Sequence, residues 1–477
     1  MSKCVIAAAI GAALLMPNLA VGETSDEIST IRRELESMRE SYEARLRELE
    51  TRLEQAEARA REQEPATAAL TEAQQAPSPP PPQAGYSPTA GRFNPAISVI
   101  LQGSLNSYSE NPDDYALPGF QLGGESDLAG EGFTLDETEI IASANVDHLF
   151  AAQTTIALHD DGDDTEIELE EAYVDPLALP VGLGGRFGRF YSDIGYLNRF
   201  HPHSWDFRDN PLAYRAYLGS QYGDDGVRLS WIAPTDIYLT LGAERFAGDN
   251  FPAGESQRTL GDVQSLYLKL GGDVGTSHAW QAGLSGLWVD AHDRAGGGHA
   301  HAGEADAEAS FSGDSTLAIA DVVWRWAPQG NPRQRNLKLQ SEFFYRDESG
   351  DVTVSEDAAA GLLDYDGTQK GWYAQAVYQF VPHWRLGLRY DWLSADNDLA
   401  ALDLGGFVDA DALVAASGLD SDGHDPQRWS GMLDWSPSEF SRLRLQYNRD
   451  ESRADATDHQ WTLQYLMSIG SHGAHEF

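Results

Sequence analysis

The chain has 477 residues, a formal net charge of −42 and a mean hydropathy of −0.42, and it is rich in glycine, tyrosine, phenylalanine and tryptophan. So large an acidic excess disfavours nucleic acid and anionic substrates, and it favours cations as solutes or as bridging ions at the surface. The single cysteine, Cys4, lies in a segment expected to be removed, which excludes disulfides and thiolate chemistry from the mature protein.

Residues 1–22 have the pattern of a secretory signal peptide. Lys3 supplies a positive charge, an apolar run extends from Val5 to Met16, and small residues lead to an expected cleavage site near Gly22. The run is too short to span a bilayer comfortably, and no later segment holds about eighteen consecutive apolar residues. We therefore expect an exported protein that does not cross the inner membrane by a second helix.

Residues 23–64 predict a periplasmic α-helical coiled coil. Apolar residues recur there at alternating spacings of three and four, with Arg and Glu on the flanks. These apolar residues are Ile28, Ile31, Leu35, Met38, Tyr42, Leu46, Leu49, Leu53, Ala56 and Ala60. The alternative is a single solvated helix, but so regular a stripe favours partner helices. By analogy with barrels that carry such a helix, we expect a homotrimer.

Residues 65–91 include Pro77 and Pro79–Pro82 and predict an extended linker.

Residues 92–477 predict an all-β fold, a transmembrane antiparallel β-barrel of about sixteen strands. The clearest strand lies near the C-terminal Phe477, where Trp461, Leu463 and Tyr465 alternate with Thr462 and Gln464. Each of sixteen candidate segments is near the length that a tilted strand needs to cross a membrane. The segments are 96–106, 133–146, 151–159, 166–174, 183–190, 227–233, 236–246, 263–272, 278–290, 315–326, 337–347, 372–381, 384–394, 428–436, 441–448 and 459–468.

The connections between these segments alternate in length. Short turns predict the periplasmic side and long acidic loops the outer side, so both chain ends would lie in the periplasm. The long connections are 107–132, 191–226, 247–262, 291–314, 348–371 and 395–427. Aromatic residues beside the short turns, such as Trp231, Trp384 and Trp435, predict an interfacial girdle. In the alternative fold, a soluble β-sandwich, these side chains would lie in the core.

The loop 191–226 is the expected pore constriction, because a sixteen-stranded barrel leaves an aqueous channel that an inward-folded loop can narrow. Its charged side chains would set a transverse electric field across that channel. These side chains are Arg199, Asp206, Arg208, Asp209 and Arg215. The alternative is that they hold the loop together through contacts with one another.

Histidine and carboxylate side chains suggest metal binding at two places. His201, His203 and Asp206 offer donors that suit zinc or another divalent metal ion. His299 and His301 form a second candidate group in a glycine-rich loop. For any single histidine, the alternative is a structural hydrogen bond. No cofactor is required, and Zn²⁺ or another divalent cation is the candidate ligand.

Catalytic motifs are missing from the sequence. We find no nucleophile elbow, no Walker loop and no dinucleotide fingerprint, and carboxylates are too numerous for one pair to stand out. We therefore predict no catalytic residues and do not expect an enzyme.

Several motifs resemble proteobacterial outer-membrane proteins known as zinc-regulated outer-membrane receptors, which are related to the phosphate-selective porin O/P superfamily. The motifs are Gly195-Tyr-Leu-Asn198, His201-x-His203-x-Trp205-Asp-Phe-x-Asp209-x-Pro211, Trp231-x-Ala-Pro-Thr235 and Met467-Ser-x-Gly-x-His472-Gly-Ala-His475. The resemblance covers most of residues 92–477 and implies a porin-like barrel associated with metal. Two departures matter. No plug domain precedes the strands, and the acidic chain argues against phosphate selectivity.

These observations predict an outer-membrane, porin-like channel for small solutes that prefers cations and is linked to the uptake of zinc or another divalent metal. Its expected partners are outer-membrane lipid, lipopolysaccharide and small cationic solutes. One alternative is a structural envelope tether in which the barrel serves as the anchor of the coiled coil. A barrel-borne enzyme is the less favoured alternative.

Overall fold

A computed structural model of the chain describes residues 95–123, 126–160, 165–257, 261–296, 308–356, 359–454 and 456–470. The predicted signal peptide, coiled coil and linker lie outside the described residues, as do His299, His301 and Phe477. Within the described ranges, no helix combines the length and the apolar character needed to cross a membrane.

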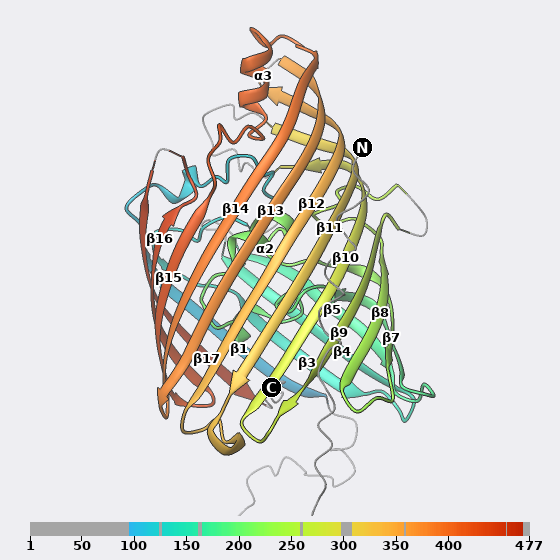
Figure 1. Cartoon of the computed structure of the whole chain (residues 1–477), viewed down its shortest axis with the longest axis vertical. Coiled ribbons are helices and arrows are strands. Elements are labelled where there is room, and N and C mark those ends of the chain that lie inside the picture. Colours follow the sequence, from blue (N-terminus) through green and yellow to red (C-terminus); the bar gives the residue numbers. More distant parts are fainter. Residues whose placement is uncertain are drawn as a thin grey trace, which may run out of the picture. The chain divides into compact units, whose positions relative to one another are not determined.

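The strands close into a single antiparallel β-barrel (Figure 1). Most strands pair with their neighbours in the chain, and β1 pairs with β17 on one side and with β2 and β3 on the other. Because β2 and β3 follow each other along β1, they form one interrupted strand, and the barrel has the sixteen strands that the sequence predicts.

The strands of the barrel are β1 (Ala96–Ser107), β2 (Gly132–Thr134), β3 (Thr138–Asn145), β4 (Phe150–Asp160), β5 (Thr165–Pro176), β6 (Leu183–Tyr191), β7 (Gly223–Ile232), β8 (Tyr238–Phe246), β9 (Val263–Val274), β10 (His278–Ala295), β11 (Glu308–Trp326), β12 (Asn336–Glu356), β13 (Ala359–Val381), β14 (Trp384–Asp403), β15 (Gln427–Ser438), β16 (Ser441–Glu451) and β17 (Asp458–Gly470). The helices are α2 (Leu212–Leu218), α3 (Ala410–Ala416) and the 3₁₀ turns η2 (Pro112–Asp114), η3 (Pro202–Ser204) and η4 (Pro328–Gly330).

The polarity of the barrel is inverted relative to a water-soluble protein. Along β17, Trp461, Leu463 and Met467 point outward and are 50%, 48% and 50% exposed, whereas Gln460 and Gln464 are buried inside. In a sheet with one face in water, the exposed face is the polar one. An outer face of Leu, Trp and Met is instead the surface that a barrel presents to lipid.

Aromatic side chains lie on the outer face beside the short turns. Trp384 and Trp435 are paired across β14 and β15, and their rings stack with centroids 6.1 Å apart. Trp231 also points outward, and its indole N–H donates to the carbonyl of Val181 in the neighbouring turn. The predicted girdle is therefore on the surface, and the sandwich alternative, which needs these rings in a core, is wrong.

Strands β10–β14 are longer than expected, with 18, 19, 21, 23 and 20 residues. The prediction of a loop at 348–371 is wrong, because β12 and β13 continue their pairing through almost all of it. The reason is that apolar residues still alternate inward there. Val352 and Leu363 are fully buried and belong to the same apolar cluster as Leu413 of α3. Figure 1 shows this extended hairpin beside α3.

The connection between β6 and β7, residues 192–222, folds into the barrel, and we call it loop 3. It carries α2, and all seven residues of this helix are buried. Figure 1 shows α2 enclosed by the strands. Tyr217 of α2 stacks on Phe344 of β12 with ring centroids 5.7 Å apart. On β13, a Cβ at Gly371 would lie 2.6 Å from the Tyr217 ring, so this glycine permits the close approach of the helix.

The outward apolar face generates a first prediction. Leu463 lies near the middle of β17, and the replacement Leu463→Arg should destabilise the folded barrel by about 2–4 kcal/mol if that face contacts the bilayer interior. The measurement is equilibrium unfolding in denaturant with the protein folded into lipid vesicles. Leu404→Arg, in the loop after β14, is the matched control and should change the free energy of unfolding little. Equal effects at both positions would contradict lipid contact at Leu463.

Candidate functional site

The start of loop 3 is held by Glu342 of β12, which is 1% exposed. Its carboxylate accepts hydrogen bonds from the backbone N–H groups of Tyr196 (2.9 Å) and Leu197 (3.2 Å). It also accepts from the hydroxyls of Tyr214 (3.0 Å) and Tyr373 (2.5 Å). Four donors converge on this one buried carboxylate, so Glu342 fixes the path by which the loop enters the barrel.

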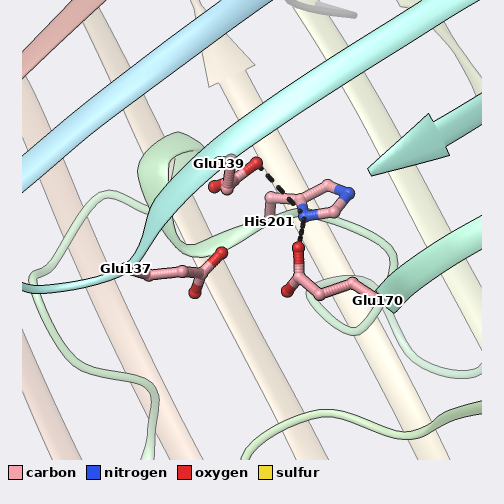
Figure 2. Close-up of side chains that lie close together, drawn as sticks. All are labelled: Glu137, Glu139, Glu170 and His201. Atoms are coloured by element: carbon pink, nitrogen blue, oxygen red, sulfur yellow. Dashed lines mark ion pairs between the residues drawn. The ribbon is translucent and has the colours of Figure 1, made fainter. Parts of the chain in front are cut away.

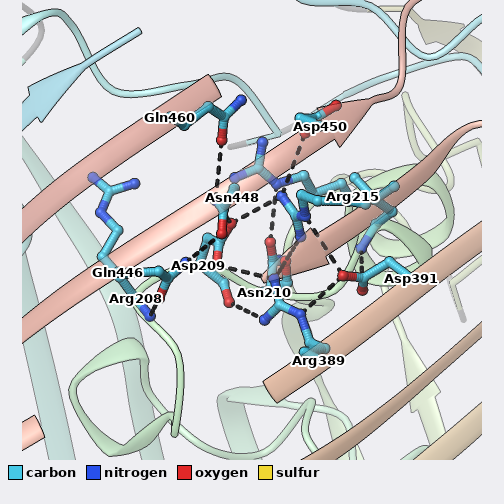
Figure 3. A network of polar contacts seen from close by, with 12 residues as sticks. Arg208, Asp209, Asn210, Arg215, Arg389, Asp391, Gln446, Asn448, Asp450 and Gln460 are labelled. Atoms are coloured by element: carbon cyan, nitrogen blue, oxygen red, sulfur yellow. Dashed lines mark hydrogen bonds and ion pairs between the residues drawn. The ribbon is translucent and has the colours of Figure 1, made fainter. Parts of the chain in front are cut away.

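The middle of loop 3 is held by Asp209, which lies in a network of polar side chains from β14, β15 and β16 (Figure 3). Its carboxylate contacts Arg389 at 3.0 Å and Arg428 at 2.8 Å, and it accepts from Gln446 (2.6 Å) and Asn448 (3.1 Å). Burial raises the pKa of Asp209, but Arg428 and Arg389 outweigh that effect and hold the pKa well below its usual range.

Two further side chains of the loop pair with the barrel wall. Asp206 contacts Lys338 of β12 at 2.9 Å and Arg385 of β14 at 3.0 Å. Burial raises the pKa of Asp206, but these two cations outweigh burial and lower the pKa well below its usual value. Arg208 contacts Asp136, between β2 and β3, at 3.0 Å. Loop 3 is thus tied to distant parts of the ring by charge.

The remaining two predicted constriction residues have partners nearby. The guanidinium of Arg199 lies 3.7 Å from Asp193. Arg215 is buried in α2 and donates to the side chain of Asn210 at 3.2 Å and to the carbonyl of Ser126 at 3.3 Å. The burial of Arg215 and of Asp209 favours the anchoring alternative for these two. A pore-lining role for the others stays a prediction.

The structure brings the two predicted metal-binding histidines together. The rings of His201 and His203 stack with centroids 5.7 Å apart. Nε2 of His201 lies 3.0 Å from Glu171 of β5, and Nδ1 of His203 lies 2.6 Å from Oε1 of Glu139 of β3. Because an ionised carboxylate can only accept, each of these ring nitrogens carries the proton and donates it.

The other nitrogen of His201 faces two carboxylates (Figure 2). Nδ1 lies 3.5 Å from Oε2 of Glu139 and 3.5 Å from Oε2 of Glu170. Burial favours the neutral imidazole, but the nearby carboxylates of Glu139, Glu170 and Glu171 outweigh burial and raise the pKa of His201 well above its usual value. The surroundings therefore favour a positive charge at Nδ1, whether it is a proton or a metal ion.

The predicted third ligand, Asp206, does not join the histidines. Among the described residues, the group that could hold a metal around His201 consists of Glu137, Glu139 and Glu170, with ligand atoms within 4.8 Å of one another. Asp206 instead forms ion pairs with Lys338 and Arg385, which compensate its negative charge. Sequence reasoning missed the glutamates. The only sequence feature that pointed to Glu139 and Glu170 was their position in strands whose alternate residues face inward, and Glu137 precedes such a strand.

Comparison with known proteins gives the following. No family model matches the chain. An uncharacterized protein of Aquifex aeolicus is 29% identical over 413 aligned residues, and the match covers 81% of this chain and 80% of the relative. The outer membrane channel DcaP of Acinetobacter baumannii is 14% identical with a TM-score of 0.46, covering 79% of this chain and 97% of that one. An anion-selective porin from Comamonas acidovorans is 8% identical with a TM-score of 0.46, covering 79% and 99%. Likeness at this level carries no argument about function.

The Asp209 network generates a second prediction. Asp209→Ala leaves the buried guanidinium groups of Arg389 and Arg428 without one of their main counter-ions, and breaking a buried pair in this way costs about 3–5 kcal/mol. The free energy of unfolding in detergent micelles should fall by roughly that amount. Asp398→Asn, on an exposed position of β14, is the control and should have little effect. An unchanged stability of the Asp209→Ala protein would contradict an anchoring role.

A third prediction concerns pH. The pKa values of Asp206 and Asp209 in the folded protein lie below the value of about 3.9 expected for an unfolded chain. Their contribution to stability is therefore fully present above that value, and it is lost only as pH falls through the lower folded pKa. Hydrogen exchange at the backbone N–H groups of residues 206–210, corrected for the intrinsic rate, should stay constant from pH 7 to about pH 4. Increased exchange already between pH 7 and about pH 5 would show that these carboxylates do not hold the loop.

Proposed function

We propose that the protein is an outer-membrane, porin-like channel for small solutes in which loop 3 forms the constriction. The observation that carries the proposal is a closed barrel with an apolar outer face and a polar interior, into which a loop is folded and fastened by charged side chains. Only barrels and helices satisfy all backbone hydrogen bonds in lipid, and the described helices are too short. Membrane lipid and lipopolysaccharide are then its surroundings.

A preference for cations is supported by the charge of the interior. Among the described residues, fourteen carboxylate side chains are buried against seven buried Arg and Lys side chains. The excess is concentrated near His201, where Glu139, Glu170 and Glu171 converge. Two half-buried cations, Lys338 on β12 and Arg385 on β14, pair with Asp206 further along the same loop segment. Such a separation of charge supports a transverse field along loop 3.

More specifically, we propose that the channel serves the uptake of divalent metal ions and that zinc is the leading candidate. We also propose that three copies of the chain assemble into a homotrimer. The support for the trimer is the regular apolar stripe of residues 23–64, since parallel helices of this kind assemble through their apolar positions.

The test is electrical and forms a fourth prediction. The full chain, reconstituted in a planar bilayer with a potassium chloride gradient, should conduct, and its reversal potential should show a higher permeability for potassium than for chloride. Glu342→Ala removes the anchor at the start of loop 3 and should increase the single-channel conductance. Glu168→Ala, at an exposed position of β5, is the control and should not.

Two results would contradict the proposal. A folded protein that does not conduct would rule out a channel. A reversal potential that shows a preference for chloride would rule out the cation preference while leaving the channel.

A further inference from the structure

The inner wall of the barrel contains a group of side chains whose free atoms converge on one point. The atoms are Nδ1 of His201 in loop 3, Oε2 of Glu139 on β3 and Oε2 of Glu170 on β5 (Figure 2). Glu137, at the entrance to β3, places a fourth ligand atom within 4.8 Å of these three. The group therefore joins loop 3 to two strands of the wall.

The opposite side of the imidazole is already occupied. Nε2 of His201 lies 3.0 Å from Glu171, which can only accept a hydrogen bond, so the ring proton is on Nε2. In the neutral imidazole, the lone pair of Nδ1 is thereby directed toward Glu139 and Glu170. Metal-bound histidines show the same arrangement, in which the second ring nitrogen donates to a carboxylate that fixes the tautomer.

The two carboxylates are oriented in a similar manner. Oε1 of Glu139 accepts from Nδ1 of His203 at 2.6 Å, and Oε1 of Glu170 accepts from the hydroxyl of Tyr191 at 2.7 Å. In each glutamate, one oxygen is held by a neighbour and the other points at His201. Ligands held by such outer partners lose little freedom when an ion binds.

The three converging atoms are buried and, within the described ranges of the chain, none of them has a hydrogen-bond partner. Glu139 is 0% exposed and Glu170 is 8% exposed. Two carboxylate oxygens and a nitrogen lone pair that face one another away from water repel each other unless a positive charge lies between them. The arrangement thus requires an ion or a proton.

The distances between the ligand atoms distinguish a bound metal ion from a proton. Ligands at 2.0–2.1 Å from a tetrahedral zinc ion lie about 3.4 Å from one another. Both separations from Nδ1 of His201 are 3.5 Å, close to that value. A proton on Nδ1 would need a carboxylate oxygen at about 2.7–3.2 Å, and it could serve only one of the two. The geometry suits a metal ion better than a proton.

We propose that Glu139, Glu170 and His201, with Glu137 as a fourth donor, bind a divalent transition-metal ion inside the barrel. The inference rests on the proposed channel and names the class of cation that the channel retains. One imidazole nitrogen among carboxylate oxygens suits zinc and related first-row ions, whereas calcium and magnesium prefer oxygen ligands alone. A bound ion would tie loop 3 to β3 and β5, so its presence would change the constriction.

The experiment uses the full chain, folded in detergent and freed of metal by a chelator. Zn²⁺ titrated in a calorimeter should bind, and Glu170→Gln and His201→Gln, which each remove a ligand, should weaken that site by at least the roughly tenfold to hundredfold that loss of a ligand's outer partner causes. Glu168→Gln changes the same residue type two positions away on β5, at an exposed site, and should bind as the unmodified protein does. Heat-dependent mobility in electrophoresis verifies that every variant is folded. Absent zinc binding, or variants with unchanged affinity, would overturn the site.

Conductance separates this inference from the channel proposal. In a bilayer with chelator present, the channel should conduct, and added Zn²⁺ should lower the potassium conductance of the unmodified protein but not that of Glu170→Gln. If the channel conducts and zinc neither binds nor changes the current, the metal site is refuted and the channel stands. If zinc binds at these residues but no current flows, the channel is refuted and the site stands.

Discussion

The pairing of β1 with β17 is the constraint on which the rest of the structure depends. It closes the ring, and with it every strand has two neighbours to receive its backbone hydrogen bonds. Without closure, an open edge would expose N–H and C=O groups that lipid cannot satisfy. Closure also sorts the side chains, because alternate residues must face either the outside or the interior. Leu463 and Gln464 of β17 are neighbours in the chain and end in opposite surroundings for this reason.

The alternation of side chains between the two faces of the sheet places charged side chains in the confined interior, where each of them needs a partner. Loop 3 supplies many of these partners. Asp209 meets two arginines from β14 and β15, and Glu342 receives the backbone N–H groups at the start of the loop. Loop 3 and the inner wall of the barrel therefore compensate each other's charges. Helix α2 of loop 3 adds an apolar contact, since Tyr217 stacks on Phe344 inside the barrel.

Much of this fold follows from the sequence, because alternation and turn length are local. All sixteen strands were predictable from segments such as 459–468, and the inward course of the loop from its length and position. What failed depended on contacts between distant residues. The loop expected at 348–371 is strand because Val352 and Leu363 join an apolar cluster with α3. The partners of His201 could not be predicted, since Glu139 and Glu170 reach it only through the register of β3 with β4 and of β4 with β5.

The two ends of the segment 201–209 show how the same type of side chain acquires different roles. Asp209 lies between guanidinium groups, and its charge is compensated by fixed parts of the chain. Glu139 has one oxygen held by His203, while the other faces Glu170 and Nδ1 of His201. A carboxylate with fixed counter-ions stabilises the fold, and it has little affinity left for an ion from solution. A carboxylate oxygen that faces another carboxylate gains most from a mobile cation, and for this reason we propose that the His201 end of loop 3 retains the cation.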